Sequence, residues 1–242
     1  MAPVYRNAID ACAAARFAIA AGKVTQMTSG PDPEIMSRLT SVADKAEPLC
    51  QIARLFSARQ WCLATSGNFS VRAHKGHCLI TESGKDKSTL TSDDLIICTL
   101  DGKAVDSTRR PSAETEIHCC LYEFDNNIGA VLHTHSATST VLSRVADSDL
   151  YFEHYEMQKA FNGVSSHIGG VGLVILENSQ KMPSIVKELK ERWLSGDITA
   201  PGFLIRGHGL YAWGKDLFEA QRHTEGLEFL MACTWQEQIA KK

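Results

Sequence analysis

Two histidines separated by a single residue, His133 and His135, form the most distinctive chemical pattern in this sequence of 242 residues. They follow a short apolar run at 130–132 that is typical of a buried strand. In a strand, residues i and i+2 point to the same face with Cα atoms roughly 7 Å apart, so two imidazoles can converge on one ion. The pattern therefore indicates a metal site at a strand end, although two unrelated polar residues have the same spacing.

A catalytic zinc site needs a third protein ligand and an open fourth position. His208 is the best candidate because it lies between Gly207 and Gly209, and flanking glycines let the backbone turn tightly and approach a ligand. Three neutral imidazoles suit Zn²⁺, with Fe²⁺, Mn²⁺ and Co²⁺ as alternatives. The sequence thus predicts one zinc ion per subunit, held by His133, His135 and His208.

Two further segments, 65–70 and 81–87, are rich in glycine and hydroxyl side chains, and the second also carries lysines. Backbone N–H groups in such turns, together with hydroxyls and a lysine, suit a phosphate monoester. Ser112, at the start of a predicted helix, adds another possible donor. Ordinary hairpin turns have the same composition, so these segments alone leave both interpretations open.

Acid or base catalysis would require a carboxylate near the metal. Glu114 opens the predicted helix after Pro111 and Ser112, whereas Glu153 and Glu156 bracket His154. Their spacing does not choose among them, because an isolated glutamate is usually a solvated surface residue. The sequence lacks the Gly-x-Ser-x-Gly pattern of a nucleophilic serine.

The elements that must position these residues alternate between helices and short strands. Apolar periodicity and turn residues predict helices at 4–22, 44–59, from Pro111 onward with Ser112 as its cap, 137–145, 183–193 and 216–239. Strands are expected at 69–72, 78–81, 95–100 (turning at Asp101-Gly102 to pair with 103–105), 128–134, 171–176, 203–206 and 210–213. The mixture predicts a layered α/β fold with helices on the faces of one sheet.

The composition narrows the class of protein. With 44% apolar and 22% charged residues, the chain is an ordinary globular protein, and a net charge of −3 argues against a nucleic-acid partner. No uninterrupted apolar run approaches about 18 residues, so we expect no membrane span. The eight cysteines include no Cys-x-x-Cys pair, which predicts reduced, buried thiols in a cytoplasmic protein.

Five motifs, taken in order, resemble those of the class II aldolase/adducin family. They lie at 66–70, 83–85, 111–115, 133–136 and 207–210. Within this family, 156–159 and 207–214 are similar to the methylthioribulose-1-phosphate dehydratases. The resemblance covers about residues 46 to 238. It implies a catalytic domain at 46–242 behind an N-terminal helical extension and linker at 1–45. It also implies a three-layer α/β/α fold with a largely antiparallel central sheet flanked by helices.

The resemblance also assigns roles to individual residues. It implies zinc at the same three histidines, Glu156 as the catalytic acid/base, and a homotetramer with sites near subunit interfaces. Thr115 stands where animal dehydratases have a substrate-contacting cysteine. The phosphate of a small phosphorylated ketose would lie among Asn68, Ser83, Gly84, Lys87 and Ser112. Neither a nucleic acid nor a membrane is implied as a partner.

The implied reaction is the dehydration of 5-methylthioribulose 1-phosphate to 2,3-diketo-5-methylthiopentyl 1-phosphate in methionine salvage. The C3 proton is removed, and the C4 hydroxyl leaves with a proton from Glu156, which burial would help by raising its pKa. The group that takes the C3 proton stays open. A sugar-phosphate aldolase or 4-epimerase is the alternative, because Glu114 matches the carboxylate of class II aldolases. A non-catalytic, adducin-like module is disfavoured because all three histidines are present.

Overall fold

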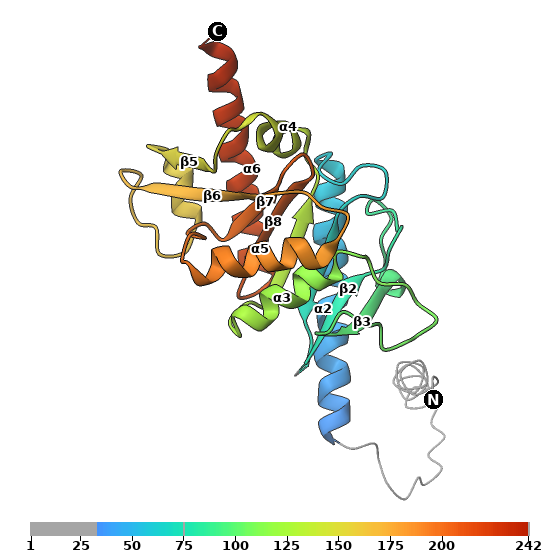
Figure 1. The fold of residues 1–242 in the computed structure, drawn as a ribbon. Coiled ribbons are helices and arrows are strands. Elements are labelled where there is room, and N and C mark those ends of the chain that lie inside the picture. The colour runs from blue at the N-terminus through green and yellow to red at the C-terminus, as the bar shows by residue number, and fades with distance from the viewer. Residues whose placement is uncertain (1–32, 75, 242) are drawn as a thin grey trace, which may run out of the picture.

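The computed structural model describes residues 33–74 and 76–241 and places eight strands in one sheet (Figure 1). The strands are β1 (Asn68–Arg72), β2 (His77–Thr81), β3 (Leu95–Thr99), β4 (Ala130–Thr134), β5 (Leu150–Glu153), β6 (Gly170–Leu176), β7 (Gly202–Ile205) and β8 (Gly209–Gly214). Their order across the sheet is β3-β2-β1-β4-β8-β7-β6-β5. Among these described strands, β6 and β7 run parallel and the other neighbouring pairs are antiparallel. The predicted largely antiparallel sheet is confirmed.

Helices cover both faces of the sheet, which gives three layers (Figure 1). They are α2 (Pro33–Ala58), α3 (Thr115–Phe124), α4 (Ala137–Val145), α5 (Met182–Leu194) and α6 (Leu217–Ala240), with short 3₁₀ turns η1 (Ser92–Asp94) and η2 (Glu156–Ala160). Side-chain alternation along β4 shows the layering. Val131 packs with α3 and α5, whereas Ala130 and Leu132 pack on the other face with α2. On that second face α4 and α6 cover the strands from β8 to β5.

The structure corrects several local predictions. Helix α3 begins at Thr115 after Glu114, so the predicted Ser112 cap is wrong; the Ser112 hydroxyl instead accepts a hydrogen bond from the Glu114 backbone N–H at 3.3 Å. The predicted hairpin after β3 is present but short: the Thr99 N–H donates to the Lys103 carbonyl and the Val105 N–H to the Ile97 carbonyl, each at 2.9 Å, on either side of a bridge between Cys98 and Ala104. Strand β5 was not predicted, because its four residues pair at the sheet edge without a strong apolar run.

The N-terminal part of the described chain is one continuous helix. Helix α2 extends from Pro33 to Ala58, so the helix predicted at 44–59 is its C-terminal half. Because the helix crosses residue 45, the predicted boundary between 1–45 and 46–242 does not coincide with the end of an element, and it stays a prediction. The helix predicted at 4–22 lies outside the described residues.

The cysteines and helices agree with the expectations from composition. The seven described cysteines are free, and all except the half-buried Cys233 are buried; Cys12 lies outside the described residues. None of the helices in the described part of the chain combines the length and the apolar character that crossing a membrane requires.

Candidate metal centre

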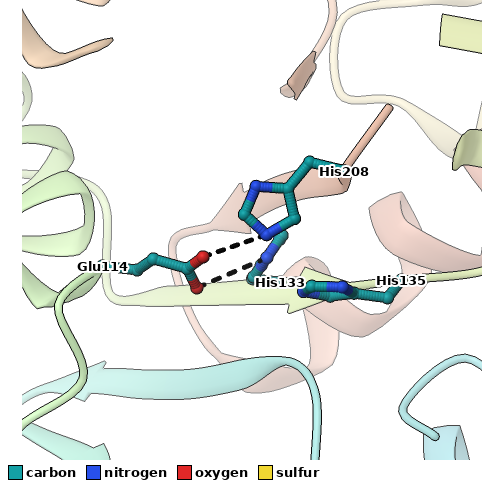
Figure 2. Close-up of side chains that lie close together, drawn as sticks. All are labelled: Glu114, His133, His135 and His208. Atoms are coloured by element: carbon teal, nitrogen blue, oxygen red, sulfur yellow. Dashed lines mark ion pairs between the residues drawn. The ribbon is translucent and has the colours of Figure 1, made fainter. Parts of the chain in front are cut away.

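Four side chains converge at one end of the central strands (Figure 2). His133 is the penultimate residue of β4, and His135 follows that strand. His208 lies in the turn between β7 and β8, and Glu114 directly precedes α3. One potential ligand atom from each of the four lies within 4.8 Å of the others. The structure therefore brings the three predicted histidines together, and it adds Glu114.

Strand pairing explains why residues so distant in sequence meet. Strand β8 pairs with β4, with Thr134 opposite Leu210, so the turn that carries His208 lies beside the end of β4. Gly207 adopts a left-handed φ of +65°, which favours glycine. A Cβ on Gly209 would lie 2.0 Å from the carbonyl oxygen of Thr134, closer than any side chain allows. Both glycines therefore let the turn approach β4, as their place beside His208 in the sequence predicts.

His133 and His135 present free nitrogens to the site. The Nδ1–H of His133 donates to the carbonyl oxygen of Leu210 at 2.9 Å. The Nε2 of His133 is then unprotonated and carries a free lone pair. This Nε2 is buried and without a hydrogen bond, as is the Nε2 of His135. The nearest carboxylate oxygen of Glu114 lies 3.5 Å from the His133 Nε2, beyond a good hydrogen bond. Buried polar atoms without partners are costly, and a cation between these rings would satisfy both.

The charge states also suit a cation. Burial lowers the pKa of His133 well below its usual value and lowers that of His135 to about 4, so both rings are neutral near pH 7. Burial opposes ionisation of Glu114, but its interactions with the nearby histidines His133 and His208, with a 3.0 Å contact from His208, and a hydrogen bond from the Asn68 amide outweigh it, and the Glu114 pKa falls below its ordinary range. Neutral imidazoles and one carboxylate form a donor set typical of zinc and other divalent transition metals.

A buried chain of hydrogen bonds supports Glu114 from behind. The Asn68 amide donates to the Glu114 carboxylate, so its carbonyl oxygen accepts from the Nε2–H of His118. The Nδ1 of His118 then accepts from the Ser70 hydroxyl at 2.7 Å, and Ser70 accepts from Tyr122 at 2.7 Å. Burial lowers the pKa of His118 to about 3, which keeps this ring neutral. Asn68, predicted to bind phosphate, thus has only its second amide N–H left for a ligand.

The two glycine-rich segments lie next to each other, and Lys87 joins them. Its side chain is only 1% exposed, and its ammonium donates to the carbonyl oxygens of Thr65 at 2.8 Å and Lys85 at 2.7 Å. No sequence pattern indicated these structural partners, which leave one N–H of Lys87 for a phosphate. Ser83 and Gly84 lie exposed on the second turn.

A cavity of about 610 Å³ opens onto the metal cluster. Besides Glu114, His135 and His208, it is lined by Ser66, Ala113 and Gly207 from the sequence motifs. The other lining residues were not singled out by the sequence, namely Leu63, Thr140, Asn178, Ser179, Gln180 and Met182. The only sequence signal for the 178–182 segment is a polar loop between a strand and a helix. Thr115, beside the cavity residue Glu114, is buried, and its hydroxyl has no hydrogen-bond partner. Thr115 itself is not among the residues that line the cavity.

Glu156 does not line this cavity. It begins η2, its side chain is 66% exposed, and its carboxylate pairs with Lys159 at 2.6 Å and His167 at 2.8 Å. The hydrogen bond from Lys159 lowers the pKa of Glu156. The burial that would raise this pKa is therefore not provided by the described part of a single chain.

Comparison with known proteins connects this chain to a family. Residues 47–235 match the family described as class II aldolase and adducin N-terminal domain. A protein of Pectobacterium carotovorum named methylthioribulose-1-phosphate dehydratase is 47% identical over 180 residues, which cover 74% of this chain and 87% of the relative.

Solved structures show the same fold. An aldolase II superfamily protein from Pseudomonas syringae superposes with a TM-score of 0.68 at 21% identity, over 86% of this chain and 80% of the other. An L-fuculose-1-phosphate aldolase from Thermus thermophilus superposes with a TM-score of 0.64 at 25% identity, over 82% of this chain and 97% of the other. These likenesses confirm the predicted α/β fold class.

Proposed function

The chain belongs to the class II aldolase and adducin family, and we propose that it catalyses the zinc-dependent dehydration of 5-methylthioribulose 1-phosphate to 2,3-diketo-5-methylthiopentyl 1-phosphate. The observation that carries the proposal is the pair of buried, neutral Nε2 atoms of His133 and His135, which face His208 and Glu114. The Pectobacterium carotovorum relative, which is named methylthioribulose-1-phosphate dehydratase, supports this substrate over other phosphorylated ketoses. The enzyme would be a cytoplasmic lyase of methionine salvage.

The three imidazoles would hold one ion per subunit, with Glu114 beside them. When bound, a divalent cation supplies Lewis-acid polarisation of substrate oxygens, which acidifies the neighbouring C–H bond. Glu114 is ionised and lies within the cluster, so we propose that it acts as the base that removes the proton from C3. The C3–H electrons then expel the C4 hydroxyl, which leaves as water with a proton from Glu156. The enol that remains loses the proton of its C3 hydroxyl and gains a proton at C4, which gives the diketone.

The remaining predicted residues would hold and orient the substrate. Its phosphate would contact Asn68, Ser83, Gly84, Lys87 and Ser112, where backbone and side-chain N–H groups and hydroxyls are available. The unpartnered hydroxyl of Thr115 would contact the sugar. Fixing the phosphate end places the reacting carbons against the metal cluster, which contributes to the rate through orientation.

An aldolase is the second candidate, and the placement of the two carboxylates favours it. Glu114, which matches the class II aldolase carboxylate, lies in the cluster, whereas Glu156 is exposed on η2. The same centre would then promote cleavage of a carbon–carbon bond and release an aldehyde.

A substrate panel separates these two reactions. The purified, zinc-loaded chain is incubated with 5-methylthioribulose 1-phosphate and with L-fuculose 1-phosphate and ribulose 1-phosphate, and both aldehyde release and loss of water are followed. We expect loss of water from the methylthio substrate and no aldehyde. Aldehyde release as the main reaction would overturn the dehydratase proposal in favour of the aldolase.

A further inference from the structure

A carboxylate buried behind the metal cluster takes no part in the proposed reaction. Glu228 lies on α6 and is 4% exposed. Its two oxygens accept hydrogen bonds from the hydroxyls of Thr134 at 2.8 Å and Ser136 at 2.6 Å. These two residues are the sequence neighbours of His135. The Glu228 carboxylate therefore hydrogen-bonds to the residues on both sides of His135, a predicted metal ligand.

The alternation of side chains at the end of β4 explains this arrangement. His133 and His135 point toward the cluster, so Thr134 and Ser136 between and after them project toward α6 on the opposite side. Ser136 is also the N-cap of α4, because its hydroxyl oxygen accepts from the backbone N–H of Ser139 at 3.0 Å. Glu228 thus fixes the junction at which the strand ends and the next helix begins.

His133 and His135 are held in different ways. The ring of His133 is oriented directly by its hydrogen bond to the Leu210 carbonyl. His135 is held through its backbone, whose N–H donates to the carbonyl of Trp61 at 2.7 Å, and through the hydroxyls of its two neighbours. Loss of the hydrogen bonds to Glu228 would therefore affect the position of His135 more than that of His133.

Burying the Glu228 carboxylate at this position lowers the stability of the fold. Its neighbours on α6 include the fully buried Leu227, Leu230 and Met231, so an apolar side chain would suit this layer. Burial raises the pKa of Glu228 to about 7. Burying an acid costs free energy even when it is hydrogen-bonded. Groups that hydrogen-bond behind metal ligands orient those ligands. Such a role accounts for a buried acid at this position despite its cost in stability.

We propose that Glu228 is a positioning residue that holds His135 in place for the metal by binding the hydroxyls of Thr134 and Ser136. The inference rests on the metal site of the proposed function and not on its substrate. It is independent of whether water or an aldehyde is released.

The test measures metal affinity in the full chain. Dissociation constants for Zn²⁺ are obtained by competition with a chelator, and the visible spectrum of the Co²⁺-loaded protein reports ligand geometry. Glu228→Leu should weaken Zn²⁺ binding by roughly 10- to 100-fold and alter the Co²⁺ spectrum. Glu228→Gln keeps one acceptor oxygen, so its loss should be smaller.

A matched control separates positioning from general stability. Glu219 is a second buried acid on the same helix, and it accepts from the backbone N–H of Lys215 away from the cluster. Glu219→Leu should lower the melting temperature of the metal-free protein but leave the Zn²⁺ dissociation constant unchanged. Wild-type affinity in Glu228→Leu, or an equal loss in Glu219→Leu, would overturn the proposal.

A milder variant keeps the proposal testable should Glu228→Leu not fold. Thr134→Val removes one of the two hydroxyls that hydrogen-bond to Glu228, with almost no change in side-chain shape. This variant should weaken Zn²⁺ binding several-fold. Unchanged affinity in this variant would count against the proposal. Failure of the wild-type chain to bind any divalent metal would instead remove the proposed function itself.

Discussion

At the scale of single residues, the charge of Glu114 fixes the direction of the hydrogen bonds behind it. An ionised carboxylate only accepts, so Asn68 must present its N–H groups to Glu114 and its oxygen to His118. His118 then carries its proton on Nε2 and accepts from Ser70. Each buried polar atom in this chain of hydrogen bonds has a partner, and the position of Glu114 is therefore set from the core outward.

The neutral state of His118 predicts how stability depends on pH. The unfolded chain protonates this residue below about pH 6.5, whereas the folded chain does so only near pH 3. Between these values the unfolded state binds more protons, so stability falls as the pH drops. From about pH 7.5 to about pH 5, metal-free wild type should lose roughly 2 kcal/mol more than His118→Gln. Urea unfolding at both pH values measures this, and parallel losses would show that His118 is not buried neutral.

The two candidate carboxylates predict different kinetic outcomes. For a dehydratase, Glu156→Gln removes the acid for the C4 hydroxyl, so kcat should fall by roughly 10²- to 10⁴-fold while zinc content and KM change little. Steady-state kinetics on 5-methylthioribulose 1-phosphate measure this effect. Glu114→Gln is the comparison, because an aldolase would lose more with this change than with Glu156→Gln. Near wild-type kcat in Glu156→Gln would remove the proposed acid.

At the scale of elements, the site depends on the close contact between β4 and the start of β8. Gly209→Ala would place a methyl group against the carbonyl of Thr134, so the strands must separate and the turn bearing His208 must move. We expect a loss of roughly 1–3 kcal/mol in stability together with weaker zinc binding. Gly169→Ala is the control, because a Cβ there meets nothing within 4 Å. Thermal unfolding and metal titration of both variants test this, and equal behaviour would contradict the argument.

Elements with strong local patterns could be predicted from the sequence, and those that depend on tertiary contacts could not. Helix α4 matches its predicted bounds because Ser136 caps it and apolar residues repeat along it. The Ser112 cap failed because two residues separate it from the start of α3, where Glu114 takes the capping position without a side-chain bond. Strand β5 depends on its pairing with β6, which no local pattern reveals.

The same distinction applies to the site. His133 lies on β4 and His135 directly follows it, so their convergence was readable from spacing alone. Glu114 could not be chosen, because α3 reaches β4 only through packing in three dimensions. Lys87 looked free of partners in the sequence, since its contacts are backbone carbonyls of turns whose course depends on the fold. Glu228 lies 92 residues from Ser136, and no local pattern connects the two.

At the scale of the whole molecule, several large apolar side chains remain exposed on the single chain, including Ile168, Leu194, Phe218 and Phe229. Exposed apolar surface of this kind is often covered by another subunit. Together with the exposure of Glu156, this suits the proposed homotetramer with sites near subunit interfaces. We expect a solution mass of about four times the 26.6 kDa of the chain, measured by light scattering.

A tetramer would give Glu156 a route to a metal cluster, because a neighbouring subunit could supply it. Mixed tetramers made from inactive His135→Ala and weakly active Glu156→Gln chains should then regain part of the wild-type activity, since some sites combine an intact cluster with an intact Glu156. Tetramers of either variant alone are the controls. A monomer in solution, or mixtures no more active than their components, would contradict this arrangement.

The metal content of histidine variants tests the central claim most directly. Inductively coupled plasma mass spectrometry would count divalent ions in the purified wild type, in His133→Ala and in His135→Ala. His167→Ala, a histidine that pairs with Glu156 outside the cluster, serves as the control. The account predicts one zinc ion per chain in the wild type and the control and a large loss in the other two variants, because two imidazoles hold zinc far more weakly than three. Full zinc content in His133→Ala or His135→Ala, or none in the wild type, would contradict it.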